Sequence, residues 1–305
     1  MQKKKTYGFL FLKIEIMKLL RSILPFLLLS FVAQAQSPIK DGAILAEFSV
    51  SDSTKVYFSQ GNLLYNGSPW WWFAEHQWNR TSTYEYDYQD EYYEEDIDPS
   101  ADVTFNIFPW GTSGYNGKNP NLISVITMTS RTIYNYGDGT NDIAGTNYDW
   151  GVYNKIFNGG DKAGLWRTLT KEEWNYLIKN RANASEKYGV ANVEGVNGLI
   201  LLPDKWELPK DIVFTSGVLN VYNGSGYYLN NYTASEWAKM ETGGAVFLPT
   251  VFDRAGGDII GFYWSSSACG DKQAYCLFFS YKYLGISSTT RAYRMAVRLV
   301  QDVKK

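Results

Sequence analysis

Short runs of alternating apolar residues, separated by turn-forming Gly, Asn and Ser, recur along this chain and constrain its fold more than any other feature. Two such runs lie at residues 43–50 and 55–59, and the stretch 262–300 consists largely of them. Alternation with a period of two is typical of strands that bury one face. A strand-rich domain with long connecting loops is therefore expected.

Three segments between these runs have helical signals instead. In residues 170–178, Thr170 and Glu173 have capping-box spacing, and the apolar residues that follow fall on one face. A weaker helix is predicted over residues 149–157, and a third from about residue 235 to residue 242; each is followed by a Gly-Gly pair that supplies a stop. Two or three helices among many short strands predict an α+β fold.

The N-terminus contains an apolar run of twelve residues, 22–33, which is shorter than the roughly 20 residues of a membrane span. Lys18 and Arg21 precede this run, and a small-residue Ala-Gln-Ala exit ends at Ala35. This arrangement is typical of a secretory signal peptide that is cleaved after Ala35. The alternative is an uncleaved membrane anchor. We expect export to the periplasm, the cell surface or the extracellular space.

Cleavage would leave residues 36–305, which we expect to form a single domain because no Pro/Ser-rich linker divides them. The chain has 29 basic and 31 acidic residues, of which six basic and one acidic lie in residues 1–35. The mature chain would therefore carry 23 basic and 30 acidic residues, a net charge of −7. This charge argues against nucleic acid as a partner. No transmembrane segment is expected after cleavage.

Two segments are candidates for metal binding. Residues 84–98 hold eight acidic residues and five tyrosines but lack the Gly and Asn spacing of a calcium loop, so we interpret them as a surface loop. Residues 137–142 (GDGTND) have better ligand types, yet a Gly/Asn turn is the preferred interpretation. With one His and two Cys in the chain, an ordinary His-rich zinc site and a disulfide scaffold are excluded. No cofactor or metal is expected.

Seven phrases along the chain resemble one family of secreted proteins from Bacteroides-type bacteria. The phrases are VYFSQGNL (56–63), FPWGTSGY (108–115), YDWG (148–151), WRTLTKEEW (166–174), LLPD (201–204), FYWSSS (262–267) and AVRLV (296–300). Over residues 43–301 they resemble, in order, the Fibrobacter succinogenes major paralogous domain, which is similar to the C-type-lectin-like fold of the formylglycine-generating enzyme group. The resemblance implies an exported protein with this α+β fold.

Residues 264–300 resemble the variable region of proteins diversified by diversity-generating retroelements, which randomise Asn-like codons on a C-type-lectin-like scaffold. Within this region, Tyr275, Leu277 and Phe279 would share one uniformly large and apolar strand face, as a core face should. The other face has no common chemistry, as expected of a display face, although the solvent face of an ordinary edge strand is the alternative. The expected ligand-contacting residues are Cys269, Asp271, Cys276, Phe278, Ser280, Tyr281, Tyr283, Ser288, Thr289, Thr290 and Tyr293.

The two cysteines, Cys269 and Cys276, are close in the sequence. In an exported protein a disulfide between them is one alternative, but so small a loop gains little stability and a strand position for Cys276 opposes the bond geometry. Formylglycine-generating enzymes use a cysteine pair for copper and oxygen chemistry. Neither the spacing nor the surroundings of this pair match that use, so the resemblance does not imply enzymatic activity.

His76 is the one histidine of the chain, and it follows the aromatic residues 70–73. We interpret His76 as a packed residue at the edge of the surface, with a general base as the alternative. Residues 70–73 are expected to pack under a loop, with a sugar-stacking platform as the alternative. The Glu-Pro-Asn and Trp-Asn-Asp motifs of calcium-dependent lectins do not occur in the sequence. Lectin-like therefore describes the expected fold and not sugar binding.

Together these features predict an exported protein, not an enzyme, that binds a ligand through residues 268–295 on a fixed scaffold. The expected ligand is a protein or glycan on another cell, a phage or a host surface. Tyr, Ser and Gly, which are common in this segment, are also the usual composition of adaptable binding loops. The alternatives are a structural or adhesive surface component without a diversified site, and a degenerate enzyme of the formylglycine-generating type.

Overall fold

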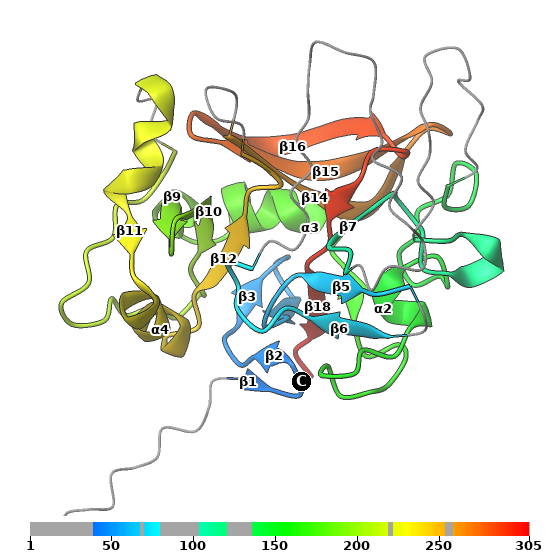
Figure 1. The fold of residues 1–305 in the computed structure, drawn as a ribbon, viewed down its shortest axis with the longest axis horizontal. Helices are drawn as coiled ribbons and strands as arrows, with labels where there is room; N and C mark the ends of the chain where they lie inside the picture. The colour runs from blue at the N-terminus through cyan, green and yellow to red at the C-terminus, as the bar shows by residue number, and fades with distance from the viewer. Residues whose placement is uncertain are drawn as a thin grey trace, which may run out of the picture. The chain divides into compact units, whose positions relative to one another are not determined.

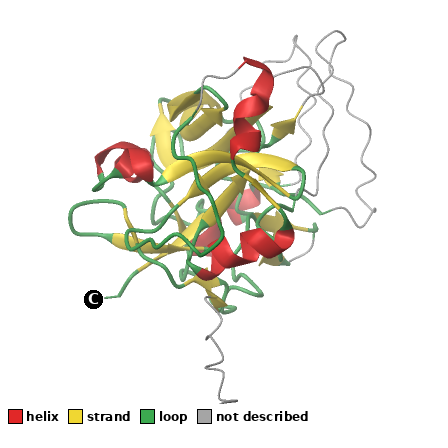
Figure 2. Cartoon of the chain, turned by 90° about the vertical axis from the view of Figure 1, so that its left-hand side faces the viewer, coloured by secondary structure: helices red, strands yellow, loops and turns green. Residues whose placement is uncertain are grey.

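The structure is a computed structural model that describes residues 39–67, 70–79, 104–120, 136–218, 222–253 and 259–304. By its internal contacts the chain separates into Met1–Ser37 and Pro38–Lys305, and all described residues belong to the second unit. The predicted signal peptide and the acidic run 84–98 lie outside the described residues. Strands and loops dominate the described chain and helices are few (Figure 1, Figure 2), which confirms the α+β class.

The largest sheet has six strands and contains most of the C-terminal stretch that the sequence predicts as strands. Strands β14, β15 and β16 form a long antiparallel meander, and β14 also pairs with β13 and, in parallel, with β17. Gly270, at a φ of 73°, lies in the tight β14–β15 turn, where a left-handed backbone favours glycine. The strands are β7 (Ile107–Phe108), β13 (Phe252–Asp253), β14 (Ile259–Cys269), β15 (Gln273–Ser280), β16 (Tyr283–Thr290) and β17 (Met295–Ala296).

A four-stranded sheet brings strands from both ends of the second unit together, in the order β3-β4-β18-β8. Val300 of β18 pairs with Phe58 of β4, and Leu299 pairs with Thr168 of β8. The predicted strand over residues 43–50 is interrupted, because the Ala46 N–H donates to the carbonyl of Ile44 at 2.8 Å and closes a tight turn. The strands of this sheet are β3 (Phe48–Ser49), β4 (Lys55–Phe58), β8 (Arg167–Thr168) and β18 (Leu299–Asp302), whereas β1 (Ile39–Lys40) and β2 (Ala43–Ile44) pair with each other in a separate two-stranded sheet.

A second four-stranded sheet has the order β11-β9-β10-β12, and β5 pairs separately with β6. Glu194 and Gly195 form the two-residue turn between β9 and β10, both with positive φ (50° and 79°), as a type I′ hairpin requires. The strands are β5 (Leu63–Tyr65), β6 (Trp71–Phe73), β9 (Tyr188–Val193), β10 (Val196–Leu201), β11 (Asn231–Tyr232) and β12 (Val246–Pro249).

The predicted capping box at Thr170 fixes where the helix α3 begins. The Thr170 hydroxyl accepts from the Glu173 N–H at 3.1 Å, and the Glu173 carboxylate accepts from the Thr170 N–H at 2.9 Å. The predicted helix over residues 149–157 is shorter than expected, because Asn154 has an extended backbone. The helices are η1 (Tyr115–Gly117), α2 (Trp150–Tyr153), α3 (Lys171–Asn175), η2 (Tyr176–Asn180), η3 (Ala184–Glu186), η4 (Tyr222–Leu229) and α4 (Ala234–Thr242).

Three clusters of buried apolar side chains hold these layers together. The first joins the six-stranded sheet to α3, η2 and the strands β3 and β4. The second gathers tryptophans from β6, α2 and two loops around the other face of β14 and β15. The third lies between α4 and the β9–β10–β12 sheet. The β14–β16 meander is therefore covered on both faces over part of its length, and this decides which of its side chains can meet a ligand.

Candidate functional site

The β14–β16 meander has two faces whose residues follow from its register. Residues opposite each other in neighbouring antiparallel strands lie on the same face. Tyr263, Leu277 and Ile286 form one such row, and Phe262, Phe278 and Gly285 form another on the reverse side. Helix α3 contacts β14, β15 and β16, and we call the face that contributes to the first cluster the α3 face. The other is the distal face.

The α3 face is a core face near its centre. Tyr263, Leu277 and Phe279 are fully buried there, and Leu284 and Ile286 of β16 pack against the same cluster. The alternation in residues 274–280 therefore predicts the buried positions Leu277 and Phe279 correctly. Tyr275 shares this face but is only half-buried, because it lies near the open β14–β15 end.

The distal face is not exposed along its whole length, as a display face would be. Cys276 is fully buried beside Trp264 and Ala274 in the second cluster, and burial raises the pKa of its thiol to about 12. Ser280 is 7% exposed. Cys276 and Ser280, which the sequence predicts as ligand-contacting residues, are buried in this structure, because β15 is a middle strand and neighbouring elements cover it on both sides.

Aromatic side chains do reach the surface at one end of the distal face. Phe262, Phe278 and Tyr283 come from three adjacent strands and form a row. The ring centroids of Phe262 and Phe278 are 5.0 Å apart, and those of Phe278 and Tyr283 are 5.3 Å apart. Phe262 and Phe278 are half-buried, and Tyr283 is 47% exposed. We call these three residues the aromatic patch.

A glycine determines how Tyr283 lies in the aromatic patch. Gly285 is on the same face of β16, two residues from Tyr283, and a Cβ atom there would be 2.6 Å from the Tyr283 hydroxyl oxygen. The missing side chain lets the Tyr283 ring lie along the strand toward Phe278. The patch thus depends on backbone geometry as well as on its three aromatic residues.

A second group of predicted residues lies on the α3 face at the opposite end of the meander. The side chain of Cys269 is hydrogen-bonded to the Tyr275 hydroxyl, which raises the pKa of that phenol. The Lys171 Nζ atom lies 4.2 Å from the centre of the Tyr275 ring. Ser288 and Thr290 are half-buried and share this face through pairing with β15.

The remaining predicted residues are dispersed. Asp271 is exposed in the β14–β15 turn, and Tyr281 packs partly against the first cluster in the β15–β16 turn. Thr289 is half-buried on the distal face opposite Ala274. Tyr293 is exposed after β16, where its N–H donates to the Thr290 carbonyl at 3.1 Å.

Of the residues predicted from sequence, the structure places only Phe278 and Tyr283 together in the exposed aromatic patch. Phe262 completes that row and precedes the segment predicted as the binding surface. Its position in the Phe-Tyr-Trp phrase marks it as a strand residue, but only the register of β14 against β15 places it beside Phe278.

The cysteines do not form the disulfide that was one alternative from the sequence. Both thiols are free. Cys269 pairs with Gln273 and so lies on the α3 face, whereas Cys276 pairs with Trp264 and lies on the distal face. The sheet itself separates the two sulfur atoms. Disulfide geometry does not allow a bond between side chains that point to opposite faces of a sheet. The pair also lacks the adjacency that a two-thiol metal or oxygen site would need.

The remaining candidates from the sequence, His76 and the segments 70–73 and 137–142, are placed by local packing and turn contacts. His76 is exposed and stacks on Trp78, with ring centroids 4.6 Å apart. Within residues 70–73, Trp71 and Phe73 are buried, so the four aromatics do not form a common platform. Residues 137–142 contain the predicted turn, closed by the Asn141 N–H on the Asp138 carbonyl at 2.9 Å. Among the described residues, His, Cys, Asp and Glu side chains form no group of three or more able to hold a metal ion.

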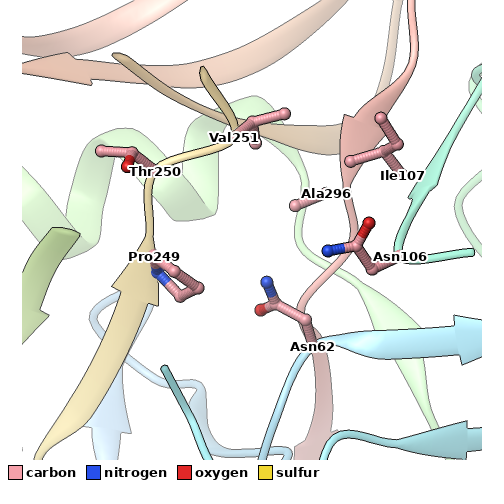
Figure 3. A pocket seen from close by; sticks show the side chains of 7 residues that line it. All are labelled: Asn62, Asn106, Ile107, Pro249, Thr250, Val251 and Ala296. Atoms are coloured by element: carbon pink, nitrogen blue, oxygen red, sulfur yellow. The ribbon is translucent and has the colours of Figure 1, made fainter. Parts of the chain in front are cut away.

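A small polar cavity lies between β12, β17 and the residues at the start of β5 and β7. Its volume is about 10 Å³, which is the space of a single water molecule. The side-chain amides of Asn62 and Asn106 point into it, and Thr250 lines another side (Figure 3). Asn62 is also hydrogen-bonded to the Tyr263 hydroxyl at 3.1 Å. This cavity is too small for an organic ligand.

Comparison with protein-family models, with curated proteins and with solved structures found no match to the chain. In the described parts of the chain, none of the helices is long and apolar enough to cross a membrane.

Proposed function

We propose that this chain is an exported binding protein that recognises a protein or glycan on a cell, phage or host surface through the aromatic patch. The observation that carries the proposal is the row of Phe262, Phe278 and Tyr283 across three paired strands, with Tyr283 47% exposed. The scaffold is proposed to be C-type-lectin-like, which the α+β architecture and the order of the sequence phrases support.

The aromatic patch has the physical properties of a binding surface. Large aromatic side chains offer contact area at a small cost in side-chain entropy, and they are enriched where binding energy concentrates. The patch stands on strands whose reverse face is packed against α3 and the first cluster. A ligand would therefore meet side chains that are already held in place, so little ordering free energy would be lost on binding.

The aromatic patch also reduces the set of positions at which we propose retroelement-driven variation. Phe278 and Tyr283 lie in residues 264–300 and have codons that adenine changes in an Asn codon can produce. Changes at Cys276 or Ser280 would act on buried positions, where a larger side chain is destabilising by about 1–3 kcal/mol. We therefore propose that tolerated variation concentrates at positions 278, 281 and 283 and at the exposed turn position 271.

The separation of the two thiols favours this proposal over a degenerate enzyme of the formylglycine-generating type. Cys269 and Cys276 lie on opposite faces of one sheet, and burial holds the Cys276 thiol in its protonated form.

A binding experiment with matched surface variants tests the proposal. The labelled protein is applied to a glycan array and, by flow cytometry, to intact bacterial cells, phage-coated beads and epithelial cells. We expect saturable binding to one of these surfaces, and at least tenfold weaker binding for Phe278→Ser and Tyr283→Ser at an unchanged melting temperature. Phe157→Ser, which removes an exposed aromatic residue elsewhere, is the control and should bind like the wild type.

Gly285→Ala adds a positional control. Its new methyl group displaces the Tyr283 ring, the end of a flexible side chain, so binding should weaken while stability changes by less than about 1 kcal/mol. Equal binding by the wild type and by Phe278→Ser and Tyr283→Ser would overturn the proposal. Sequencing residues 264–300 across a population tests the diversified form separately: a uniform segment would remove diversification and leave binding untouched.

A further inference from the structure

A hollow of about 220 Å³ lies outside the β14–β16 meander, between the loop 211–213, the end of η4, and residues of β11 and α4. Strand β11 and helix α4 are at the left edge of Figure 1. The volume is below the range of drug-sized ligand pockets, about 300–1,000 Å³. It is large enough for one long side chain.

The rim of the hollow exposes more apolar surface than an ordinary loop does. Val213 is 76% exposed, Tyr228 is 61% exposed and Leu229 is 51% exposed. Tyr232 is buried at the floor, and its hydroxyl donates to the Val213 carbonyl at 2.6 Å, which ties the loop to β11. Apolar side chains gathered around a concave surface mark an interaction site more often than scattered ones do.

The charge of the hollow is one-sided. Asp211 and Glu236 are both part of its lining, and the described residues that line it include no Lys, Arg or His. Glu236 caps α4: its Oε2 atom accepts from the Thr233 N–H at 2.9 Å and from the Thr233 hydroxyl at 2.8 Å. These bonds lower the pKa of Glu236, so its carboxylate is ionised at neutral pH.

We propose that this hollow is a second binding site, which takes an arginine side chain of a partner protein. The aliphatic stem would pack on Val213 and Leu229, the planar guanidinium would stack on the exposed Tyr228 ring, and the carboxylates of Asp211 and Glu236 would balance its charge. The assignment rests on charge complementarity and on the size of the hollow. It does not depend on the aromatic patch, which lies on the β14–β16 meander.

The test uses blocked arginine, N-acetyl-arginine N-methylamide, titrated into the purified protein and followed by NMR chemical shifts. A single side chain is expected to bind with a Kd of about 1 mM. The matched probe, in which citrulline replaces arginine, keeps the shape but lacks the charge, and it should bind about fivefold more weakly. Agmatine carries the same guanidinium without a peptide backbone. Comparing its binding with that of blocked arginine shows whether the hollow prefers a small free amine or a protein segment.

Conservative variants separate binding from folding. Asp211 has a φ of 65°, which Asn tolerates, and a capping box accepts Gln in place of Glu, so Asp211→Asn and Glu236→Gln should keep the fold. Each of these two variants should bind blocked arginine about threefold or more weakly than the wild type, and Tyr228→Ala should also bind it about threefold or more weakly. Asp161→Asn is the control, because Asp161 is also exposed with a positive φ (47°) but does not line the hollow.

The outcomes decide the proposal. Saturable binding of blocked arginine that depends on charge, on Asp211 and on Glu236 supports it. It is overturned if blocked arginine shows no saturable shifts, if the citrulline probe binds equally well, or if Asp161→Asn weakens binding as much as Asp211→Asn. Tighter binding of agmatine than of blocked arginine would replace the protein partner with a small amine and would also overturn it.

Discussion

Asp149 gives the protein a stability component that should increase on acidification. Its carboxylate is fully buried at the start of α2, where it accepts from the Thr168 N–H at 2.9 Å, the Thr168 hydroxyl at 3.0 Å and the Gly151 N–H at 3.2 Å. Desolvation outweighs these hydrogen bonds and raises the pKa of Asp149 from 3.8 to about 6. The folded protein therefore binds this proton more tightly than the unfolded chain does.

The magnitude follows from linkage between protonation and folding. A pKa of about 6 against 3.8 corresponds to about 3 kcal/mol, since each unit is worth about 1.4 kcal/mol. This stability is fully present below the unfolded pKa of 3.8 and is lost as the pH rises through 6. Between pH 8 and pH 4 the wild type should gain about 2 kcal/mol from this group alone.

The measurement compares urea unfolding of the wild type and of Asp149→Asn, followed by tryptophan fluorescence at several pH values between 4 and 8. Other carboxylates, such as Asp204 with its lowered pKa, contribute equally to both proteins and cancel in the difference. The wild-type free energy of unfolding, minus that of Asp149→Asn, should rise by about 2 kcal/mol as the pH falls. A difference that stays constant, or that falls on acidification, would refute a raised pKa at Asp149.

Two further predictions concern single substitutions, and a third concerns the reactivity of the two thiols. Thr170→Ala removes the hydroxyl of the α3 capping box and should lower the free energy of unfolding by about 1 kcal/mol in chemical denaturation, whereas Thr170→Ser should be nearly neutral. Gly261→Ala would place a methyl group inside the Phe279 ring and should destabilise the protein by about 1–3 kcal/mol. In a Phe279→Leu background, part of this loss should be recovered. The absence of recovery would contradict the clash. In mass spectrometry after iodoacetamide treatment at pH 8, half-exposed Cys269 should be alkylated and buried Cys276 spared until denaturant is added. Equal rates for the two thiols would contradict the burial of Cys276.

Local signals in the sequence are enough to predict where several elements begin and end. The capping box at Thr170 and the Gly-Gly stop after α4 involve residues within a few positions of each other, so they do not depend on tertiary contacts. The α+β class and the strand-rich C-terminal stretch follow from periodicity in the same way. The predicted helix over residues 149–157 ends at Tyr153, because the backbone of Asn154 is extended; the Asn154 N–H and its side-chain amide both donate to the Trp150 carbonyl at 3.1 Å.

Alternation assigns residues to faces but does not say what covers each face. Leu277 and Cys276 belong to opposite faces of β15, and both are fully buried, because the first apolar cluster covers one face and the tryptophan-rich second cluster covers the other. The covering residues are distant in sequence, so no local pattern reports them. This is why the predicted display face loses Cys276 and Ser280 while it keeps Phe278.

By itself, the sequence determined the fold class, the helix caps and the periodicity of the C-terminal strands, because each depends on neighbours along the chain. The tertiary structure alone decided which side chains are exposed and which of them lie side by side. Phe262 joins Phe278 only through strand register, and Asp211 meets Tyr228 and Glu236 only because loop 211–213, η4 and α4 pack around one hollow. Such sites depend on distances between residues far apart in the chain, and these distances are set by the packing of whole elements.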